Sequence, residues 1–402
     1  MFTPLFYKLF EIQCRISSFL GVFSLQFDAT KRKCYITSKS RVKSRKLLIY
    51  WINTTVFCSF QTISTSLEDG NSSNRNFRMC FAISQLTLMI LLTLGVFNMK
   101  EDLLARAISQ TLLHAEKFKK KWMPKYNPKK QLASVMIDCV IICALVSNCL
   151  IILATLRVMT YFRNMPIFVH TVFPPNWGLE EGWTIFAIEL GVFAGNCCVV
   201  SYVGMIFVVF GLAYFVPMFV IIMQEFRHGR KHYLTYHTLR TARSVPPQYR
   251  SVELIHKQLM EITGLAMVLI HGFFSQFIIF ANFSILKHWD SLDSDTKMLL
   301  AIWSFGSQIM WGLILEFGGK GQQAAKSTID SWKYMNFRKP MDKLYMDKFR
   351  RSCRPLFIGE PGVFTIKRLS SLSFQRAIIR GTFRACMTLS KDRKIVIHIL
   401  TI

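Results

Sequence analysis

The sequence of 402 residues has little charge, and most of that charge is of one sign. Charged residues make up 18% of the chain, against roughly 25% in an average globular protein. Acidic residues are especially scarce: there are 23 of them against 50 lysines and arginines, which leaves a formal net charge of +27. The basic residues lie in blocks between long apolar runs and do not interleave with amphipathic structure, so nucleic acid is not expected as a partner.

Patterns that would indicate catalysis or metal binding are missing as well. The sequence contains no recognisable catalytic triad, paired carboxylates on one helix face or zinc-binding spacing, so we expect no enzyme activity, no metal and no cofactor. His228, His232 and His237 cluster without a cysteine or carboxylate to complete a metal site, and we expect them on a solvated face. The 11 cysteines fall mostly inside apolar runs, which excludes the disulfide framework of a small secreted protein.

Apolar residues make up 51% of the chain, and they gather in runs long enough to cross a membrane. About 20 apolar residues in a helix span the roughly 30 Å of hydrocarbon in a bilayer. The fourth run would reach about 60 Å as one helix, at ~1.5 Å per residue. The seven runs are residues 47–66, 77–98, 133–162, 185–223, 262–286, 298–315 and 372–389.

Lysine and arginine alternate between the connecting segments and set the expected orientation. Segments 1–46, 99–132, 224–257 and 316–371 hold 38 of these residues, whereas the three segments between them hold only 4. The side rich in lysine and arginine is cytoplasmic in membrane proteins. A single continuous fourth helix places all four rich segments inside, and splitting it would export two of them. We therefore predict an all-α, polytopic fold of seven membrane helices with a cytoplasmic N-terminus, inverted relative to a G-protein-coupled receptor.

This topology divides the chain into four parts. They are a cytoplasmic N-terminal segment (1–46), six transmembrane helices (47–315) with the basic loops 99–132 and 224–257, a second cytoplasmic segment (316–371), and a seventh transmembrane helix with the C-terminus (372–402). Asn71 begins a glycosylation sequon in the first outer loop, as the orientation allows. The Gly-Gly-Lys-Gly stretch at 318–321 lacks the order of a phosphate-binding loop, and we expect it to break the sixth helix where that helix leaves the membrane.

Polar residues inside the apolar runs are the candidates for a ligand site. Such residues are costly in a membrane and are functional candidates by default. A ligand pocket should also be concave and largely aromatic, with few polar groups. The alternative for the amide side chains is hydrogen bonding between helices, and for the tryptophan it is packing. The candidates in the outer half of the bundle are Glu189, Asn196, Asn148, Gln276, Trp303 and Gln308.

Three arginines interrupt the last run. Arg376, Arg380 and Arg384 are four residues apart, so they stack on one face of a helix. Each would cost about 3 kcal/mol at the centre of a bilayer, which excludes a position facing lipid. Two interpretations stay open: the arginines face a water-filled pore, or residues 383–402 are not a genuine C-terminal part of a membrane helix.

Three regions carry a likeness to a known family. The first is residues 10–51, which lead through Ser18-Phe19-Leu20-Gly21-Val22 and Phe27-Asp28 into the first run. The second is residues 318–332, which contain Gln-Gln-Ala-Ala-Lys-Ser-Thr-Ile-Asp-Ser-Trp. The third is residues 349–383, which contain Arg354-Pro355-Leu356 and Gly362-Val363-Phe364-Thr365-Ile366. In order and spacing, and with the inverted topology, the chain resembles the arthropod gustatory receptors over essentially its whole length. That family belongs to the insect chemoreceptor superfamily, which also contains the odorant receptors.

The resemblance implies a ligand-gated, non-selective cation channel of the plasma membrane that binds a small-molecule tastant or odorant. It implies a homo- or hetero-tetramer with related subunits, joined by cytoplasmic helical segments, with the seventh span lining the pore. The family's last span typically carries Thr-Tyr, five apolar residues and Gln-Phe. Here Thr382 and Phe383 match the first pair, but Arg384 follows and Gln-Phe is absent. The alternatives are a secondary transporter, although no half-length repeat is seen, and a non-conducting member with a degenerate last helix.

Overall fold

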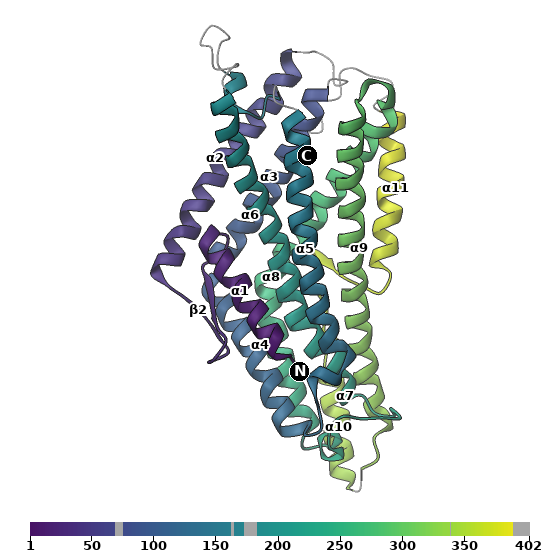
Figure 1. Ribbon diagram of the computed structural model, residues 1–402. Coiled ribbons are helices and arrows are strands. Elements are labelled where there is room, and N and C mark those ends of the chain that lie inside the picture. The colour runs from purple at the N-terminus through teal and green to yellow at the C-terminus, as the bar shows by residue number, and fades with distance from the viewer. Residues whose placement is uncertain (69–74, 162–164, 173–182, 338, 389–402) are drawn as a thin grey trace.

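The computed structural model of the chain is an elongated bundle of long helices (Figure 1). It describes residues 1–68, 75–161, 165–172, 183–337 and 339–388, without the side chains of a few residues inside helices. The helices are α1 (Pro4–Leu20), α2 (Ser38–Glu68), α3 (Arg75–Met99), α4 (Glu101–Trp122), α5 (Leu132–Tyr161), α6 (Trp183–Phe215), α7 (Met223–Phe226), α8 (Val245–Lys287), α9 (Ser294–Ser331), α10 (Pro340–Ser352) and α11 (Ser370–Thr388). Short helices of other pitch are η1 (Pro128–Lys130), η2 (Val169–Val172), η4 (Val216–Ile222), η5 (His237–Arg240), η6 (Trp289–Ser291) and η7 (Trp332–Tyr334).

The seven predicted spans all fall on helices, in the order α2, α3, α5, α6 with its continuation, α8, α9 and α11. In the part of the chain that the structure describes, four helical stretches are long and apolar enough to cross a membrane: 76–99, 183–226, 245–287 and 294–334. α2 is rich in serine and threonine, and α11 carries the three arginines, so both are less apolar than these four. The helical character of the fold is confirmed, while the number of crossings and their orientation stay predictions.

The fourth run is one continuous helical stretch from Trp183 to Phe226, as predicted. Its regular part, α6, passes into the π-helical turn η4 and then into α7. Pro217 lies at the start of η4, where its missing N–H removes one α-helical hydrogen bond. A π-helical turn absorbs such a defect without ending the helix. The stretch therefore reaches well beyond the thickness of a bilayer, into the lower half of the bundle in Figure 1.

The prediction of a break at the glycines after the sixth run is wrong, because α9 continues through them to Ser331. These glycines instead allow other segments to approach closely. A Cβ atom on Gly319 would lie 2.7 Å from the carbonyl oxygen of Lys367, and one on Gly318 would lie 2.9 Å from the side chain of Ile366. The segment that precedes α11 therefore packs directly on the backbone of α9.

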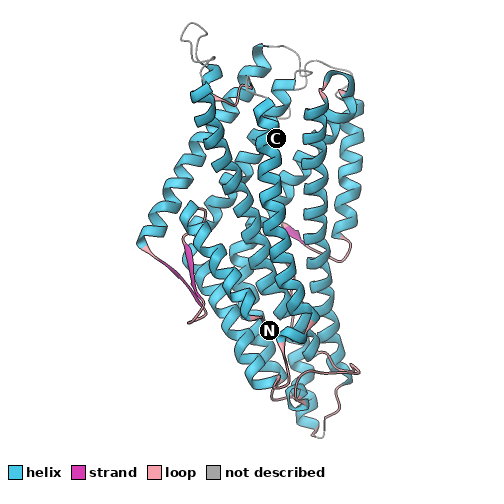
Figure 2. Cartoon of the chain, in the orientation of Figure 1, coloured by secondary structure: helices cyan, strands magenta, loops and turns pink. Residues whose placement is uncertain are grey.

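Two small hairpins interrupt the helical pattern and were not expected (Figure 2). In the first, β1 (Leu25–Asp28) pairs antiparallel with β2 (Lys33–Ile36). Asp28 forms the turn by accepting hydrogen bonds at Oδ1 from the backbone N–H groups of Thr30 and Lys31, each 2.9 Å long. The second joins β3 (Gly359–Glu360) to β4 (Phe364–Thr365). Each hairpin lies against the helices and connects two of them.

The interior divides into two clusters of buried apolar side chains. The lower cluster contains α1, β1, α4, the lower parts of α6 and α8, and the segments around η7 and α10. Its aromatic centre is Trp332, whose ring lies 5.1 Å from that of Tyr249 and 5.7 Å from that of Phe349. The indole N–H of Trp332 also donates to the carbonyl oxygen of Phe226, at 3.0 Å. The predicted second cytoplasmic segment is therefore tightly packed against α7 and α8.

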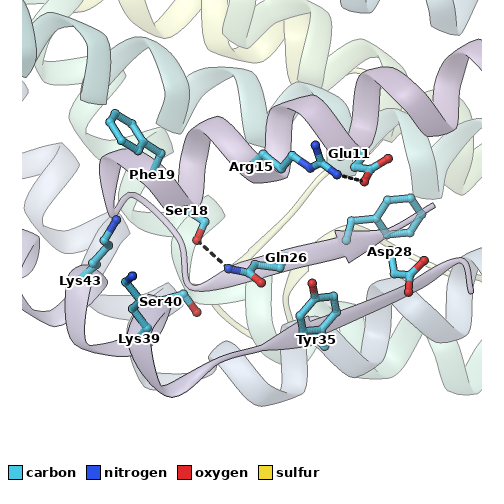
Figure 3. A pocket seen from close by; sticks show the side chains of 11 residues that line it. Glu11, Arg15, Ser18, Phe19, Gln26, Asp28, Tyr35, Lys39, Ser40 and Lys43 are labelled. Atoms are coloured by element: carbon cyan, nitrogen blue, oxygen red, sulfur yellow. Dashed lines mark hydrogen bonds and ion pairs between the residues drawn. The ribbon is translucent and has the colours of Figure 1, made fainter. Parts of the chain in front are cut away.

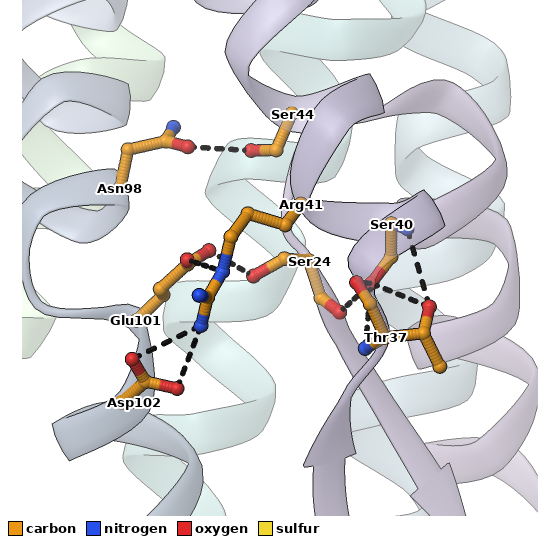
Figure 4. A network of polar contacts seen from close by, with 8 residues as sticks. All are labelled: Ser24, Thr37, Ser40, Arg41, Ser44, Asn98, Glu101 and Asp102. Carbon is orange, nitrogen blue, oxygen red and sulfur yellow. Dashed lines mark hydrogen bonds and ion pairs between the residues drawn. The ribbon is translucent and has the colours of Figure 1, made fainter.

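A polar network fixes the base of α2 (Figure 4). Arg41 donates to both carboxylate oxygens of Asp102, at 2.9 and 3.0 Å, and pairs with Glu101. The hydroxyl of Ser24, which precedes β1, donates to the other oxygen of Glu101 at 2.5 Å. Ser44 donates to Asn98 at 2.9 Å. The first turns of α2, the hairpin and the junction of α3 with α4 are thus held together by charge-assisted hydrogen bonds.

Candidate functional site

The upper cluster is the part of the interior in which the candidate ligand residues lie. It is built from side chains of α2, α3, the segment before η2, α6, α8, α9 and α11, and its largest members are aromatic. The rings of Phe168 and Phe186 meet edge to face, with centroids 5.6 Å apart. Phe193 and Trp303 pack against the same cluster from α6 and α9. An aromatic surround with few polar groups is the environment expected for a small-molecule site.

Glu189 of α6 is bound to a histidine that the sequence did not single out. The backbone N–H of His170, in η2, donates to Glu189 Oε1 at 2.8 Å, and His170 Nδ1 lies 2.5 Å from Oε2. The side chain of His170 is 3% exposed and that of Glu189 is 15% exposed. The histidine ring also packs against both Phe168 and Phe186. Both carboxylate oxygens of Glu189 are therefore used to hold η2 against α6. A ligand that contacted Glu189 would have to displace these hydrogen bonds from His170.

A second polar group joins α8 to α9. The buried hydroxyl of Ser304 donates to Asn282 Oδ1 at 2.7 Å and accepts from Gln308 Nε2 at 3.3 Å. Trp303, half-buried, lies beside Phe277 of α8, with ring centroids 6.4 Å apart. Gln308 and Trp303 are thus brought into one neighbourhood on α9. Ser304 and Asn282 belong with them, and their position as polar residues inside apolar runs is the signal by which the sequence reveals them.

The remaining candidates do not join either group. Gln276 is exposed on α8, and Asn196 is half-buried on α6, two turns from Glu189. The side chain of Asn148 on α5 and the sequon at Asn71 lie outside the described residues. Within the described residues no three histidine, cysteine or acidic side chains gather closely enough to hold a metal ion. The structure therefore brings the candidates together as two groups around one aromatic cluster.

α11 has two faces of opposite character. Phe374, Ile378 and Thr382 are buried against α8 and α9. The arginines predicted to share a face do so, because Arg376, Arg380 and Arg384 are all exposed on the side that no other helix of the described chain covers. Among the apolar residues exposed with them is Phe383, at 63%. The structure thus separates Thr382, which points into the bundle, from Phe383 and the arginines, which point away from it.

His271 connects α11 to the rest of the upper cluster. Its Nδ1 accepts from the indole N–H of Trp311 at 2.8 Å, and its ring stacks on Phe364 of β4, with centroids 4.3 Å apart. The ring of Phe374 lies 5.6 Å away. One side chain of α8 therefore contacts α9, the second hairpin and α11 together. A movement of α8 or α9 caused by a bound molecule would reach α11 through this contact.

Comparisons with known proteins find a likeness in structure but none in sequence. A scan of known protein families and a search of curated proteins give no match. The structure is similar to that of the insect olfactory receptor OR5 from Machilis hrabei, with a TM-score of 0.64 over 96% of this chain and 98% of that one. The two sequences are 11% identical, so what they share is the arrangement of the helices. The chain has the fold of an insect olfactory receptor.

Proposed function

We propose that the chain is a subunit of a chemosensory receptor channel of the plasma membrane, of the gustatory type within the insect chemoreceptor superfamily. The observation that carries this proposal is the fold likeness to an insect olfactory receptor along nearly the whole length of both chains. The gustatory assignment adds the three sequence regions described above. The helices that are long and apolar enough to cross a membrane agree with a receptor embedded in a bilayer.

The uncovered face of α11 supports assembly into an oligomer. Three arginines facing hydrocarbon would cost on the order of 3 kcal/mol each. Several copies of the chain, four in the family it resembles, would bring these faces around one axis and surround them with water. α11 then lines the central path, and α8 and α9 behind it connect that path to the upper cluster. A small molecule bound among Trp303, Gln308 and the aromatic rings would act on α11 through His271 and Phe374.

The same arginines favour a second candidate, a subunit that does not conduct cations by itself. A ring of guanidinium groups repels cations strongly in a narrow path of low dielectric constant. The chain alone would then bind ligand or modify partner subunits, and conduction would need a related subunit without the arginine face. Residues 389 and 390, where the Gln-Phe pair of the family would lie, are outside the described residues.

Purification and current recording test the two candidates together. Native mass spectrometry of the purified chain should show a tetramer; a strict monomer would contradict the proposal of a channel subunit. In cells, the unmodified chain expressed alone should carry little or no cation current across a panel of small-molecule tastants and odorants. Replacing Arg376, Arg380 and Arg384 together by leucine should increase the cation current at least ~10-fold, since each charge in a low-dielectric path contributes more than 1.4 kcal/mol.

A control removes one exposed positive charge outside α11. Arg45→Leu, at an exposed position at the base of α2, should leave the current unchanged. A robust agonist-evoked cation current from the unmodified chain would show that the arginines do not face the path, and would contradict this placement of α11.

Ligand contact at the second polar group is tested by Trp303→Phe and Gln308→Leu, which should shift agonist sensitivity without lowering surface expression. Loss of expression with unchanged sensitivity would support packing instead.

A further inference from the structure

A groove lies between the N-terminal helix, the first hairpin and the base of α2 (Figure 3). It has a volume of about 650 Å³, and side chains from α1, β1, β2 and α2 line it. It is far from the upper cluster, and none of its residues belongs to the candidate ligand or pore sites. Gly21, which ends α1 with a φ of 79°, places the end of α1 directly against the backbone of Lys43. The walls are therefore held by backbone packing and by the Arg41 network behind α2.

One end of the groove carries positive charge that the protein does not neutralise. Lys39 and Lys43 are one turn apart on α2, so their ammonium groups share a face. Neither forms an ion pair with any of the described residues, and the Lys43 ammonium group lies 5.3 Å from the centre of the Phe19 ring. Ser18 of α1 and Gln26 of β1 add a hydroxyl and an amide at the same end, joined by a hydrogen bond of 3.4 Å.

The acidic residues of the groove are already used. Glu11 pairs with Arg15 at 2.6 Å, and Asp28 accepts the two backbone hydrogen bonds of the hairpin turn. The side chain of Arg15 is 74% exposed, so its remaining N–H groups are open to solvent. The lysine end of the groove therefore offers two ammonium groups and neutral donors to one incoming anion, whereas the Arg15 guanidinium is paired with Glu11 away from that end (Figure 3). Phosphate oxygens accept from such a set of donors by charge-assisted hydrogen bonds.

The position of the groove relative to the apolar surface decides between a soluble anion and a lipid. The exposed face of α2 is apolar at Val42, Ile49, Val56 and Ile63, which recur every seven residues along the helix. Lys43 lies at the lower end of this stripe, about 9 Å below Ile49 at ~1.5 Å per residue. Phe19, beside Lys43, is 76% exposed. An apolar surface thus begins at the mouth of the groove and continues up α2, where acyl chains would lie.

We propose that this groove binds the headgroup of an anionic phospholipid that carries more than one phosphate, with Lys39 and Lys43 holding the phosphates and Phe19 and the α2 stripe contacting the acyl chains. Clusters of basic residues next to a membrane helix recognise such headgroups. With the predicted cytoplasmic N-terminus, the lipid comes from the inner leaflet. Binding there fixes α1, the hairpin and α2 to one another.

Native mass spectrometry of the full chain in detergent, with phosphatidylinositol 4,5-bisphosphate added, tests the proposal without any agonist or current. It therefore succeeds or fails independently of the proposed channel function. The unmodified chain should retain this lipid and not phosphatidylcholine. The double variant Lys39→Gln/Lys43→Gln should lose at least ~10-fold in apparent affinity, because two charge-assisted hydrogen bonds are removed. Lys39→Arg/Lys43→Arg should restore binding, and an unchanged thermal transition should show that each variant is folded.

The matched control is Lys129→Gln/Lys130→Gln, which removes the same charge at exposed positions away from the groove. It should bind as the unmodified chain does. Equal loss of binding by the two double variants would overturn the proposal, since net charge alone would then explain it, and full binding by both would overturn it because Lys39 and Lys43 would not hold the phosphates. The soluble headgroup, inositol 1,4,5-trisphosphate, should bind more weakly than the lipid, and Phe19→Ser should remove that difference. Equal binding of lipid and soluble headgroup by the unmodified chain would overturn the assignment to a lipid.

Discussion

α2 and α11 lie at opposite edges of the bundle in Figure 1, and they expose different chemistry. The outer face of α2 is apolar at Val56, Phe60 and Ile63, each more than half exposed. The outer face of α11 carries Arg376, Arg380 and Arg384, all exposed. An apolar face needs no partner in a bilayer, whereas a face with three charges needs water or another protein surface. In the assembly proposed above, α2 would border lipid and α11 would turn toward the inside.

The two helices are also anchored in different ways. The base of α2 is held by the ion pairs of Arg41 with Glu101 and Asp102. The segment before α11 is held by close packing on the glycines of α9 and not by ion pairs at these glycines. Any side chain in place of these glycines would clash with it. Ion pairs tolerate small displacements and weaken with salt, whereas backbone contact through glycine tolerates neither displacement nor added volume. We therefore expect the position of α11 on α9 to be the more sharply defined of the two.

The largest effect is expected from giving α2 the chemistry of α11. Val56→Arg places a charge near the middle of a span that faces lipid, at a cost of about 3 kcal/mol, or on the order of a 100-fold loss of correct insertion. Microsomal insertion with glycosylation tags at the two ends of α2 would measure it. Val56→Leu is the control for the change of side chain, and Arg380→Leu should insert normally. Normal insertion of Val56→Arg would remove the distinction between the two faces.

A smaller effect is expected where α11 is anchored. Gly319→Ala adds a Cβ atom 2.7 Å from the carbonyl oxygen of Lys367, and backbone cannot rotate away as a side chain does. The overpacking should cost about 1–3 kcal/mol, against a gain of up to ~1 kcal/mol from helix propensity. Gly306→Ala is on the same helix, and no atom lies within 4 Å of the added Cβ. This variant should show only the stabilisation from the higher helix propensity of alanine. Thermal unfolding in detergent should therefore move in opposite directions for the two variants, and a common shift would contradict the close packing.

The smallest effect is expected at the base of α2. Arg41→Met leaves the carboxylate of Glu101, which is 8% exposed, without its cationic partner. The stabilisation of this part of the fold should fall by about 1–2 kcal/mol, which is less than for a fully buried pair because Arg41 is partly solvated. Hydrogen exchange of residues 38–46 should accelerate accordingly. Arg45→Met, exposed and one turn away, should leave the exchange of these amides unchanged, and equal acceleration in both variants would show that the network does not stabilise α2.

The long helices were predictable because their signal is local and repeated. The continuous fourth helix followed from the distribution of lysine and arginine, and the common face of the α11 arginines followed from their spacing by four. The first hairpin was missed because its four-residue strands carry too short a pattern to stand out beside long apolar runs. The glycines at 318–321 were misread because a sequence shows that a glycine is present, not which backbone approaches it.

The candidate site was less predictable than the helices. Polar residues in apolar runs pointed to Gln308 and Glu189, but their partners depend on contacts between helices. His170 is 19 residues from Glu189, and Ser304 meets an amide of another helix 22 residues away. No spacing rule connects such residues, because the connecting segments set the distance. The pairing of Glu189 with His170 could therefore be recognised only once the fold was known.

A thiol-labelling test on the two exposed faces requires a variant from which the accessible native cysteines have been removed. Cys139, Cys143 and Cys149 are exposed on α5, and Cys197 and Cys198 on α6 and Cys386 on α11 are half-buried, so these six are replaced by serine. The lower cysteines react slowly in the folded chain: burial raises the pKa of the Cys34 thiol to about 12 and contributes to a pKa of about 11 for that of Cys353.

In that background, the reaction of a charged, membrane-impermeant thiol reagent with Arg380→Cys and with Val56→Cys tests the contrast between α11 and α2 most directly. Both positions are exposed on the single chain, and only their surroundings in the membrane differ. A cysteine in water ionises and reacts, whereas one in hydrocarbon does neither. We expect the reagent to modify the cysteine at position 380 and not the one at position 56. Equal reactivity at the two positions, or an unreactive cysteine at 380, would contradict it.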